Sequence, residues 1–322
     1  MKLKLGSLFA GIGGIDLGFA QSGVSCVWAN EINVFSAQTY KNNFTNAQLN
    51  IDDIKKIKSK DIPDINILAG GFPCQPFSIA GYRKGFDDDR GALFYQIIRL
   101  LNEFKDENRL PEVVFLENVK NLFTHNKGAT YQKMKNELSE VGYHVVERVL
   151  NTYQYGNLPQ NRERLYIICF LDKKHRNSFF WPSEIKLTNT LDKLISWDTE
   201  VAQKYYYTEN SKCYPILKEQ IKNTNSIYQY RRIYVRENKS GVSPTLTANM
   251  GMGGHNVPII KDTKGNIRKL TPKECLMLQG FPDNFIIPNN LVDSKIYQQA
   301  GNSVSIPVIK RIAESIVKAI TQ

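Results

Sequence analysis

One cysteine stands where it could act as a nucleophile. Cys74 follows an apolar run at residues 65–69, which predicts a buried strand, and Gly70, Gly71 and Pro73 separate the thiol from that run. We therefore expect the thiol on a stiff turn at the carboxyl end of a strand, the edge at which open α/β sheets bind ligands. An ionised thiol at that edge is a nucleophile. The alternative is a buried cysteine that serves as a small apolar side chain.

A glutamate ends a second apolar run. Glu117 comes directly after residues 113–116, and a carboxyl group at the end of a buried strand is partly desolvated, which favours its protonated form. A protonated carboxyl group donates one hydrogen bond and accepts another. This pair of bonds matches the ring nitrogen and the exocyclic amine of cytosine. A helix cap or a salt-bridged acid is the alternative interpretation.

Two arginines come directly before a third apolar run. Arg162 and Arg164 are two residues apart, so on an extended chain their side chains project to the same face. Guanidinium groups in that arrangement suit a phosphate or a base carbonyl. One of the two is equally suited to be a structural partner of Glu163 or Glu117.

A glycine-rich segment at residues 9–14 follows the first apolar run and opens a helix, so its backbone N–H groups can approach a ligand. Glu31 lies about twenty residues further on, at the end of the next apolar run, which is the spacing of an acid that binds a ribose diol. NAD, FAD and S-adenosylmethionine all fit this pattern, but the segment lacks the full G-x-G-x-x-G spacing of NAD sites. A tight turn followed by a surface acid is the alternative.

Short apolar runs alternate with amphipathic stretches over the first ~185 residues, and they must position these side chains. Strands are expected at residues 3–9, 24–30, 65–69, 113–116, 145–150 and 165–170, and helices at residues 15–22, 33–43, 92–104 and 131–141. This alternation predicts a mostly parallel sheet with helices on both faces. A last amphipathic stretch at residues 304–320 predicts a helix that packs back on the sheet.

The charge of the chain points to a polyanionic partner. The 322 residues carry a formal net charge of +11 and a pI near 9.2, which suggest nucleic acid first, although a basic protein without such a partner is the alternative. The five cysteines are widely spaced, with no C-x-x-C pair or Cys/His cluster, so neither disulfides nor a metal site is expected. The sequence shows no signal peptide and no apolar run approaching 18 residues, so we expect a soluble, cytoplasmic protein.

The character of the chain changes near residue 185. Residues 186–268 lack the alternation and are rich in Asn, Lys, Tyr and Thr. Tyrosines interleave there with basic residues, a combination that suits contact with phosphates and bases, or else a solvated surface. Arg231, Arg232 and Arg236 are the candidates for such contact.

In their order along the chain, these motifs closely resemble those of the bacterial C5-cytosine DNA methyltransferases of restriction-modification systems. The segments that carry the resemblance are Phe9 to Gly14, Asn30-Glu31-Ile32, Asp53-Ile54, Gly71 to Gln75, Glu117-Asn118-Val119, the spaced residues Gln160, Arg162 and Arg164, Arg268 to Pro282, and Gln299 to Val304. Ile32 is a mild departure, because some family members stack an aromatic ring on adenine at that point.

The resemblance implies the fold and its domains. It implies a Rossmann-like, S-adenosylmethionine-dependent methyltransferase with a mixed α/β sheet, helices on both faces and a smaller, strand-rich target-recognition domain. Residues 1–185 and 296–322 would form the catalytic and cofactor-binding domain. Residues 186–295 would form the recognition domain and a hinge.

The resemblance also implies the roles of individual residues. Cys74, Glu117, Arg162 and Arg164 would be catalytic, with the Cys74 thiolate adding to C6 of a flipped cytosine. S-adenosylmethionine, converted to S-adenosylhomocysteine, would be bound by Phe9, Ala10, Gly11, Ile12, Gly14, Asn30, Glu31, Ile32, Asp53, Ile54, Gly71, Pro73, Leu93, Asn302, Ser303 and Val304. DNA would be contacted by Gln75, Ser78, Arg83, Arg231, Arg232, Arg236 and Thr245. Residues 78–91 would form a mobile lid.

The implied partner is double-stranded DNA, through which the protein would associate with the nucleoid. A functionally paired restriction endonuclease without a stable complex, and a monomeric state, are also expected. The rival functions are an RNA methyltransferase, since some family members act on transfer RNA, a catalytically silent DNA-binding protein, and a nicotinamide-dependent oxidoreductase. The bacterial-type recognition region and the intact Cys74 and Glu117 favour methyl transfer to DNA.

Overall fold

The computed structural model describes residues 2–72, 92–252 and 256–322, and the chain forms two compact units. The first unit comprises Met1–Leu150, Glu163–Ser183 and Val308–Gln322, and the second comprises Asn151–Arg162 and Glu184–Pro307. Among the described residues, no helix is both long enough and apolar enough to span a membrane.

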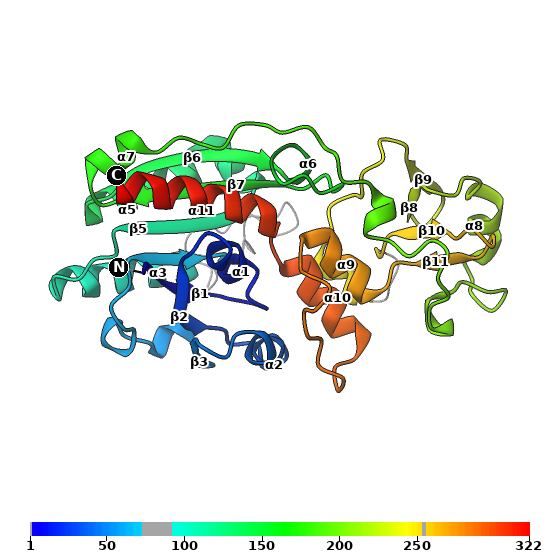
Figure 1. Cartoon of the computed structure of the whole chain (residues 1–322), viewed down its shortest axis with the longest axis horizontal. Helices are drawn as coiled ribbons and strands as arrows, with labels where there is room; N and C mark the ends of the chain where they lie inside the picture. The colour runs from blue at the N-terminus through cyan, green and yellow to red at the C-terminus, as the bar shows by residue number, and fades with distance from the viewer. Residues whose placement is uncertain (1, 73–91, 253–255) are drawn as a thin grey trace. The chain divides into compact units, whose positions relative to one another are not determined.

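A seven-stranded sheet forms the centre of the first unit (Figure 1). Its strands are β1 (Lys4–Leu8), β2 (Ser25–Asn30), β3 (Gln48–Asn50), β4 (Ile67–Gly70), β5 (Val113–Val119), β6 (His144–Asn151) and β7 (Glu163–Phe170). They lie in the order β3-β2-β1-β4-β5-β7-β6, where β1 to β5 are parallel and β7 is antiparallel to β5. The predicted mixed α/β sheet is confirmed, and only β3, a strand of three residues, was not expected from an apolar run.

Helices cover both faces of this sheet. They are α1 (Gly14–Ala20), α2 (Val34–Asn43), α3 (Ala92–Asp106), α5 (Ala129–Val141) and α11 (Ile306–Thr321), with the short α4 (Asn121–Thr124) and α7 (Lys173–Ser178). Helix α3 buries Ile97 and Leu101, four residues apart on one helix face, in the same core as Leu116 of β5. Helix α1 packs Phe19 edge-on against Phe115, with 5.2 Å between the ring centroids. Because neighbouring strand residues point to opposite faces, α1 and α3 lie on opposite sides of the sheet.

The last helix returns to the first unit, as its amphipathic pattern predicts. Ser22 Oγ, just after α1, donates a hydrogen bond to the carbonyl of Lys310 in α11 at 3.0 Å. A Cβ atom on Gly18 would lie 2.6 Å from the side chain of Ile309. Glycine is therefore required where α1 and α11 approach each other.

The second unit contains a four-stranded antiparallel sheet of short strands. These are β8 (Ile227–Tyr230), β9 (Val235–Asn238), β10 (Ile259–Lys261) and β11 (Ile267–Lys269), in the order β11-β10-β8-β9. Helices α6 (Thr152–Tyr155), α8 (Tyr214–Gln220), α9 (Pro272–Gln279) and α10 (Asp293–Asn302) belong to the same unit. The sequence patterns did not predict α8, α9 or α10. A core of Leu217, Tyr228, Ile259 and Ile267 joins α8 to the sheet.

Hydrogen bonds at the ends of helix α9 explain several residues of the motif at residues 268–282. The Thr271 hydroxyl accepts a hydrogen bond from the Glu274 N–H, and the Glu274 carboxylate accepts one from the Thr271 N–H, so the helix begins with a capping box. Gly280 ends the helix with a φ of 92°, in the left-handed region that favours glycine. Glu274 also receives two hydrogen bonds from the fully buried Arg268, at 2.8 and 2.9 Å. The motif thus encodes a helix with both ends fixed.

Candidate active site

The register of the parallel strands aligns the residues that were predicted to do chemistry. Leu8 of β1 pairs with Asn30 of β2 and with Gly70 of β4, and Gly70 pairs with Leu116 of β5. The residues that come next in each strand therefore lie along one edge of the sheet. They are Phe9, Glu31, Gly71 and Glu117. The strand order reverses between β1 and β4, and ligands of open α/β sheets bind at such a reversal.

The carboxylate of Glu31 is held by backbone N–H groups. Its Oε2 accepts a hydrogen bond from Gly11 N at 2.8 Å, and its Oε1 accepts one from Asn33 N at 2.7 Å. Burial raises the pKa of Glu31, while these two bonds lower it. Each oxygen keeps a further lone pair, so the carboxylate can also accept hydrogen bonds from a pair of hydroxyl groups.

The glycine-rich segment turns sharply beside Glu31. Phe9, Gly11 and Gly13 have φ angles of 54°, 59° and 84°. A Cβ atom on Gly11 would meet no atom of the described residues within 4 Å, so this part of the structure leaves open space there. Ala10 and Ile12 are buried and anchor the segment, and Gly14 begins α1.

The other predicted cofactor residues of the first unit divide into exposed and anchoring side chains. Ile32 is 59% exposed directly after Glu31, whereas Ile54 is buried. The amide of Asn30 donates to the carbonyl of Asp52 at 2.8 Å and so ties β2 to the segment that follows β3. Asp53 caps the short turn after it by accepting from Lys55 N. Leu93, in the first turn of α3, is partly buried against the main core.

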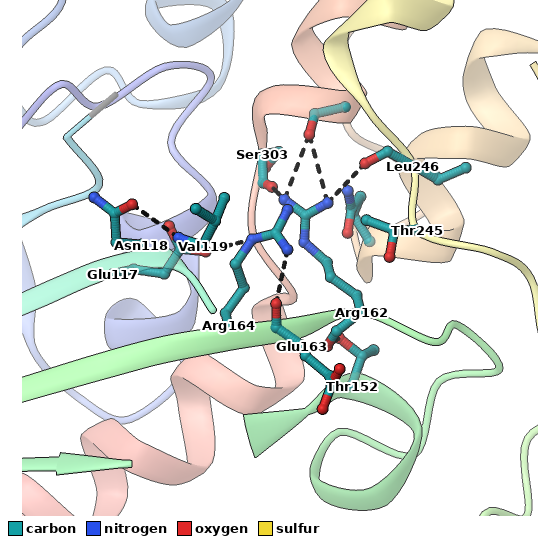
Figure 2. Close-up of polar contacts among 12 residues, drawn as sticks. Glu117, Asn118, Val119, Thr152, Arg162, Glu163, Arg164, Thr245, Leu246 and Ser303 are labelled. Carbon is teal, nitrogen blue, oxygen red and sulfur yellow. Dashed lines mark hydrogen bonds and ion pairs between the residues drawn. The ribbon is translucent and has the colours of Figure 1, made fainter. Parts of the chain in front are cut away.

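Glu117 lies inside β5 and forms an ion pair. The strand extends to Val119, and Glu117 is opposite Tyr166 of β7. The Nε of Arg164 lies 3.1 Å from Glu117 Oε1, and both side chains are largely buried (Figure 2). The structure therefore supports the alternative of a salt-bridged acid.

A neighbouring amide connects Glu117 to the start of the nucleophile segment. Asn118 Nδ2 donates to the carbonyl of Phe72 at 3.0 Å. A Cβ atom on Gly71 would lie 3.6 Å from Glu117 Oε2, which brings the backbone before the cysteine close to this carboxylate. Asn118 was not among the predicted site residues. Its position directly after Glu117 was the available signal.

Arg162 has quite different surroundings from Arg164. It is 2% exposed and precedes β7, in the second unit. Its guanidinium donates to the carbonyl of Leu246 at 2.8 Å and to the carbonyls of Gly301 and Ser303 (Figure 2). Arg162 precedes the extended strand and has other partners than Arg164, although the two are only two residues apart. Because these hydrogen bonds use N–H groups of the Arg162 guanidinium, the same N–H groups are not available to bind a base.

Two glutamines extend this arrangement within the second unit. Gln160 Nε2 donates to the carbonyl of Leu278 at 2.8 Å, and Gln279 Nε2 donates to the carbonyl of Ala300 at 2.7 Å. Thr245, a predicted DNA contact, donates through its hydroxyl to the carbonyl of Asn161 at 2.6 Å. The side chains of several motifs thus bond to backbone in the same unit, a role that their spacing along the chain does not reveal.

Three of the four arginines predicted to contact DNA lie on one hairpin. Arg231 and Arg232 are in the turn between β8 and β9, and Arg236 is in β9, with all three side chains exposed. The turn closes through a hydrogen bond from Arg231 N to the carbonyl of Tyr234 at 2.8 Å. Its apolar residue Ile233 is 82% exposed. The hairpin therefore presents a basic, partly apolar tip to solvent.

Several predicted site residues lie outside the described residues. They are Pro73, Cys74, Gln75, Ser78 and Arg83, together with the predicted lid at residues 78–91. Asn302 ends helix α10, and Ser303 and Val304 follow it as buried residues of the second unit.

Comparison with known proteins gives matches along nearly the whole chain. A model of the family described as C-5 cytosine-specific DNA methylase matches residues 3–318. The chain is 52% identical over 321 residues to the type II methyltransferase M.Bsp6I of Bacillus sp. (strain RFL6), with 98% of this chain and 99% of that protein covered. It is 39% identical over 322 residues to the type II methyltransferase M.HaeII of Haemophilus aegyptius, with 99% and 94% covered.

A solved structure shares the fold. The methyltransferase EhMeth of Entamoeba histolytica aligns over 100% of both chains with a TM-score of 0.77, at 20% sequence identity. At that identity the likeness bears on the fold alone.

Proposed function

The chain belongs to the C-5 cytosine-specific DNA methylase family and is a DNA (cytosine-5)-methyltransferase, and from this premise we propose how it acts. It transfers a methyl group from S-adenosylmethionine to C5 of a cytosine flipped out of a short, specific duplex sequence, through a covalent bond between Cys74 Sγ and C6. The observation that carries the proposal is the alignment of Glu31, Gly71 and Glu117 along one sheet edge. A ribose-binding acid, the start of the nucleophile segment and a base-binding acid are then neighbours.

The residues beside β1 and β2 fit S-adenosylmethionine. Glu31 has lone pairs left for the two ribose hydroxyls, Gly11 leaves open space for close approach, and the exposed Ile32 offers an apolar surface to adenine. When bound, the cofactor supplies an electrophilic methyl group and leaves as S-adenosylhomocysteine. We propose that the remaining cofactor residues of the first unit complete this site.

Glu117 and Arg164 are proposed to hold the flipped base. Flipping costs a few kcal/mol of lost stacking and pairing. In its protonated form Glu117 would donate a hydrogen bond to N3, accept one from the N4 amine and stabilise the charge that develops at N3. Arg164 would orient Glu117 through their 3.1 Å contact and bond the O2 carbonyl. We assign this arginine role to Arg164 and a structural role to Arg162, whose guanidinium is engaged by backbone carbonyls.

The covalent step makes C5 reactive. The Cys74 thiolate forms a bond to C6, and the electrons of the C5–C6 double bond shift onto C5, conjugated with the ring that Glu117 holds. C5 then accepts the methyl group. Loss of the C5 proton to a base, for which water is a candidate, restores the double bond and expels the thiolate. A free thiol with its usual pKa of about 8.5 is only a few per cent ionised at neutral pH, so positive charge near Cys74 would favour the reaction.

The direct test is methyl transfer from labelled S-adenosylmethionine to duplex DNA, with transfer RNA as the competing substrate. We expect label in DNA alone, and bisulfite sequencing should then place it at one cytosine of a short recurring sequence. Label in transfer RNA alone would refute the DNA assignment and support the RNA alternative.

The second unit is proposed to recognise the target sequence, with the β8–β9 hairpin among its DNA contacts. Replacing Arg231, Arg232 and Arg236 together by glutamine should weaken DNA binding. Each lost phosphate contact should also reduce the slope of log affinity against log salt by about 1. Fluorescence anisotropy at several salt concentrations measures both effects.

The matched control removes the same charge from another surface. Lys173, Lys174 and Arg176 of α7 are exposed, and α7 follows the end of β7 that pairs with the start of β5, opposite the edge of the candidate site. Their glutamine variant should keep the salt slope of the wild type. Equal losses in both triple variants would show that the hairpin has no special role.

We also propose that the chain acts as a monomer and is paired functionally with a restriction endonuclease, without a stable complex. The type II methyltransferases among its relatives support the pairing with an endonuclease. All the residues proposed for catalysis are supplied by one chain.

A further inference from the structure

A buried carboxyl group beside the glycine-rich segment takes no part in the proposed reaction. Asp16 lies in the first turn of α1 and is 0% exposed. Its oxygens accept hydrogen bonds from Ser7 Oγ at 3.0 Å, Cys26 Sγ at 2.9 Å and Tyr40 Oη at 3.0 Å. These donors come from β1, β2 and α2. One side chain thus joins four elements around the segment.

Tyr40 extends this contact to the glycine-rich segment itself. Its buried ring stacks on Phe44, with 4.6 Å between the ring centroids and 27° between the planes. A Cβ atom on Gly13 would come within 2.1 Å of the Phe44 ring, so the segment rests directly on that ring. Tyr40 also forms a small buried cluster with Ala10 and Ala29.

Burying a carboxyl group at this position costs more free energy than burying an apolar side chain. Burial raises the pKa of Asp16, and the hydrogen bonds from Cys26, Ser7 and Tyr40 oppose that effect. An apolar residue of similar size would avoid the desolvation cost. Directional hydrogen bonds in a buried network, however, fix the spacing of the elements more narrowly than apolar contacts do.

The glycine-rich segment is coupled in turn to the proposed cofactor acid. Gly11 N donates to Glu31 Oε2, and Ala10 N donates to the carbonyl of Asn30 at 2.9 Å. A shift of the segment would therefore move the N–H group that orients Glu31.

We propose that Asp16 and Tyr40 are positioning residues of the cofactor site, because they fix the glycine-rich segment on Phe44 and so set its contact with Glu31. The identity of the ligand, the ribose and amino-acid portions of S-adenosylmethionine, rests on the proposed function. Neither residue needs to touch the cofactor for this effect.

Titration calorimetry with S-adenosylhomocysteine tests the inference without any turnover. Tyr40→Phe keeps the ring and removes one hydroxyl group, and we expect its affinity to fall about three- to tenfold. Asp16→Asn keeps the size and one acceptor oxygen, and we expect a loss of about tenfold. In the double variant the loss should be smaller than the product of the two single losses, because both changes break the same bond.

Tyr143→Phe is the matched control. Tyr143 is 2% exposed, and its hydroxyl donates to the carbonyl of Pro111 at 2.8 Å, just before β5 and at the opposite edge of the sheet. This variant should lose thermal stability as Tyr40→Phe does, yet bind S-adenosylhomocysteine like the wild type.

The outcomes separate the inference from simpler explanations. Unchanged affinity in Tyr40→Phe and Asp16→Asn, with only a lower melting temperature, would overturn it, as would fully independent losses in the double variant. If Asp16→Asn does not fold, the comparison of Tyr40→Phe with Tyr143→Phe decides alone. Failure of the wild type to bind S-adenosylhomocysteine would instead refute the proposed function, whatever the variants do.

Discussion

Replacing Cys74 by alanine should abolish methyl transfer to DNA, by about 10⁴-fold or more, while binding of DNA and S-adenosylhomocysteine is retained. The proposed reaction needs a bond to C6 before C5 can accept a methyl group, and alanine offers no nucleophile in its place. Single-turnover transfer of a labelled methyl group measures the loss, and anisotropy and calorimetry measure the two binding affinities.

A second cysteine supplies the control. Cys213 is a free, partly exposed cysteine of the second unit. Cys213→Ala should keep the wild-type rate. A Cys74→Ala protein that still methylated DNA would contradict covalent catalysis, whatever its binding affinities.

DNA that contains 5-fluorocytosine at the target should trap the wild-type protein. Fluorine cannot leave C5 as a proton does, so the bond between Sγ and C6 would persist as a stable adduct. The adduct should appear in denaturing electrophoresis with the wild type and be absent with Cys74→Ala. No adduct on a confirmed target site would count decisively against the mechanism.

The second large effect is expected at Glu117. Glu117→Gln should slow methyl transfer by about 10²–10³-fold, the usual cost of removing one group that stabilises developing charge. Glutamine keeps the size of the side chain, but its amide has neither the negative charge of a carboxylate nor an acidic proton to share with N3 of cytosine. It also removes the anion that Arg164 contacts at 3.1 Å. The affinity for S-adenosylhomocysteine should stay close to that of the wild type.

Glu163→Gln is the control for this change. Glu163 makes an exposed ion pair with Lys120 at 2.9 Å, and exposed pairs contribute little. The same substitution there should change the rate less than about twofold. Equal rates for wild type and Glu117→Gln would remove Glu117 from the mechanism, and a parallel loss of cofactor binding would mean that it acts mainly on the fold.

The local patterns were sufficient to predict most of the first unit. An apolar run predicts a strand in a core because removing apolar side chains from water is favourable, so β1, β2, β4, β5, β6 and β7 were each expected. In the second unit the strands have three or four residues, too few for a period to show. Helices α8, α9 and α10 flank these strands in the chain, where no alternation of apolar runs and amphipathic stretches marked them.

Part of the candidate site could also be predicted from the apolar runs. Residues that follow buried strands meet at one edge when those strands are parallel. The position of Glu31 and Glu117 at the ends of two apolar runs therefore predicts that both lie at that edge. The strand register aligns both with Gly71.

Local patterns identify the family motifs, the alternation of strands and helices and the residue types available for chemistry, because each of these depends on residues close together in the chain. The arginine that pairs with Glu117 is known only from the folded chain. Arg162 and Arg164 look equivalent in sequence. Arg162 donates hydrogen bonds to carbonyls 84 to 141 residues away, whereas Arg164 forms an ion pair with Glu117 of the neighbouring strand β5. The network of Asp16 was hidden in the same way, because its donors lie on three other elements. Two groups form a hydrogen bond when the fold brings them close together. A local sequence pattern does not show which residues far apart in the chain become neighbours.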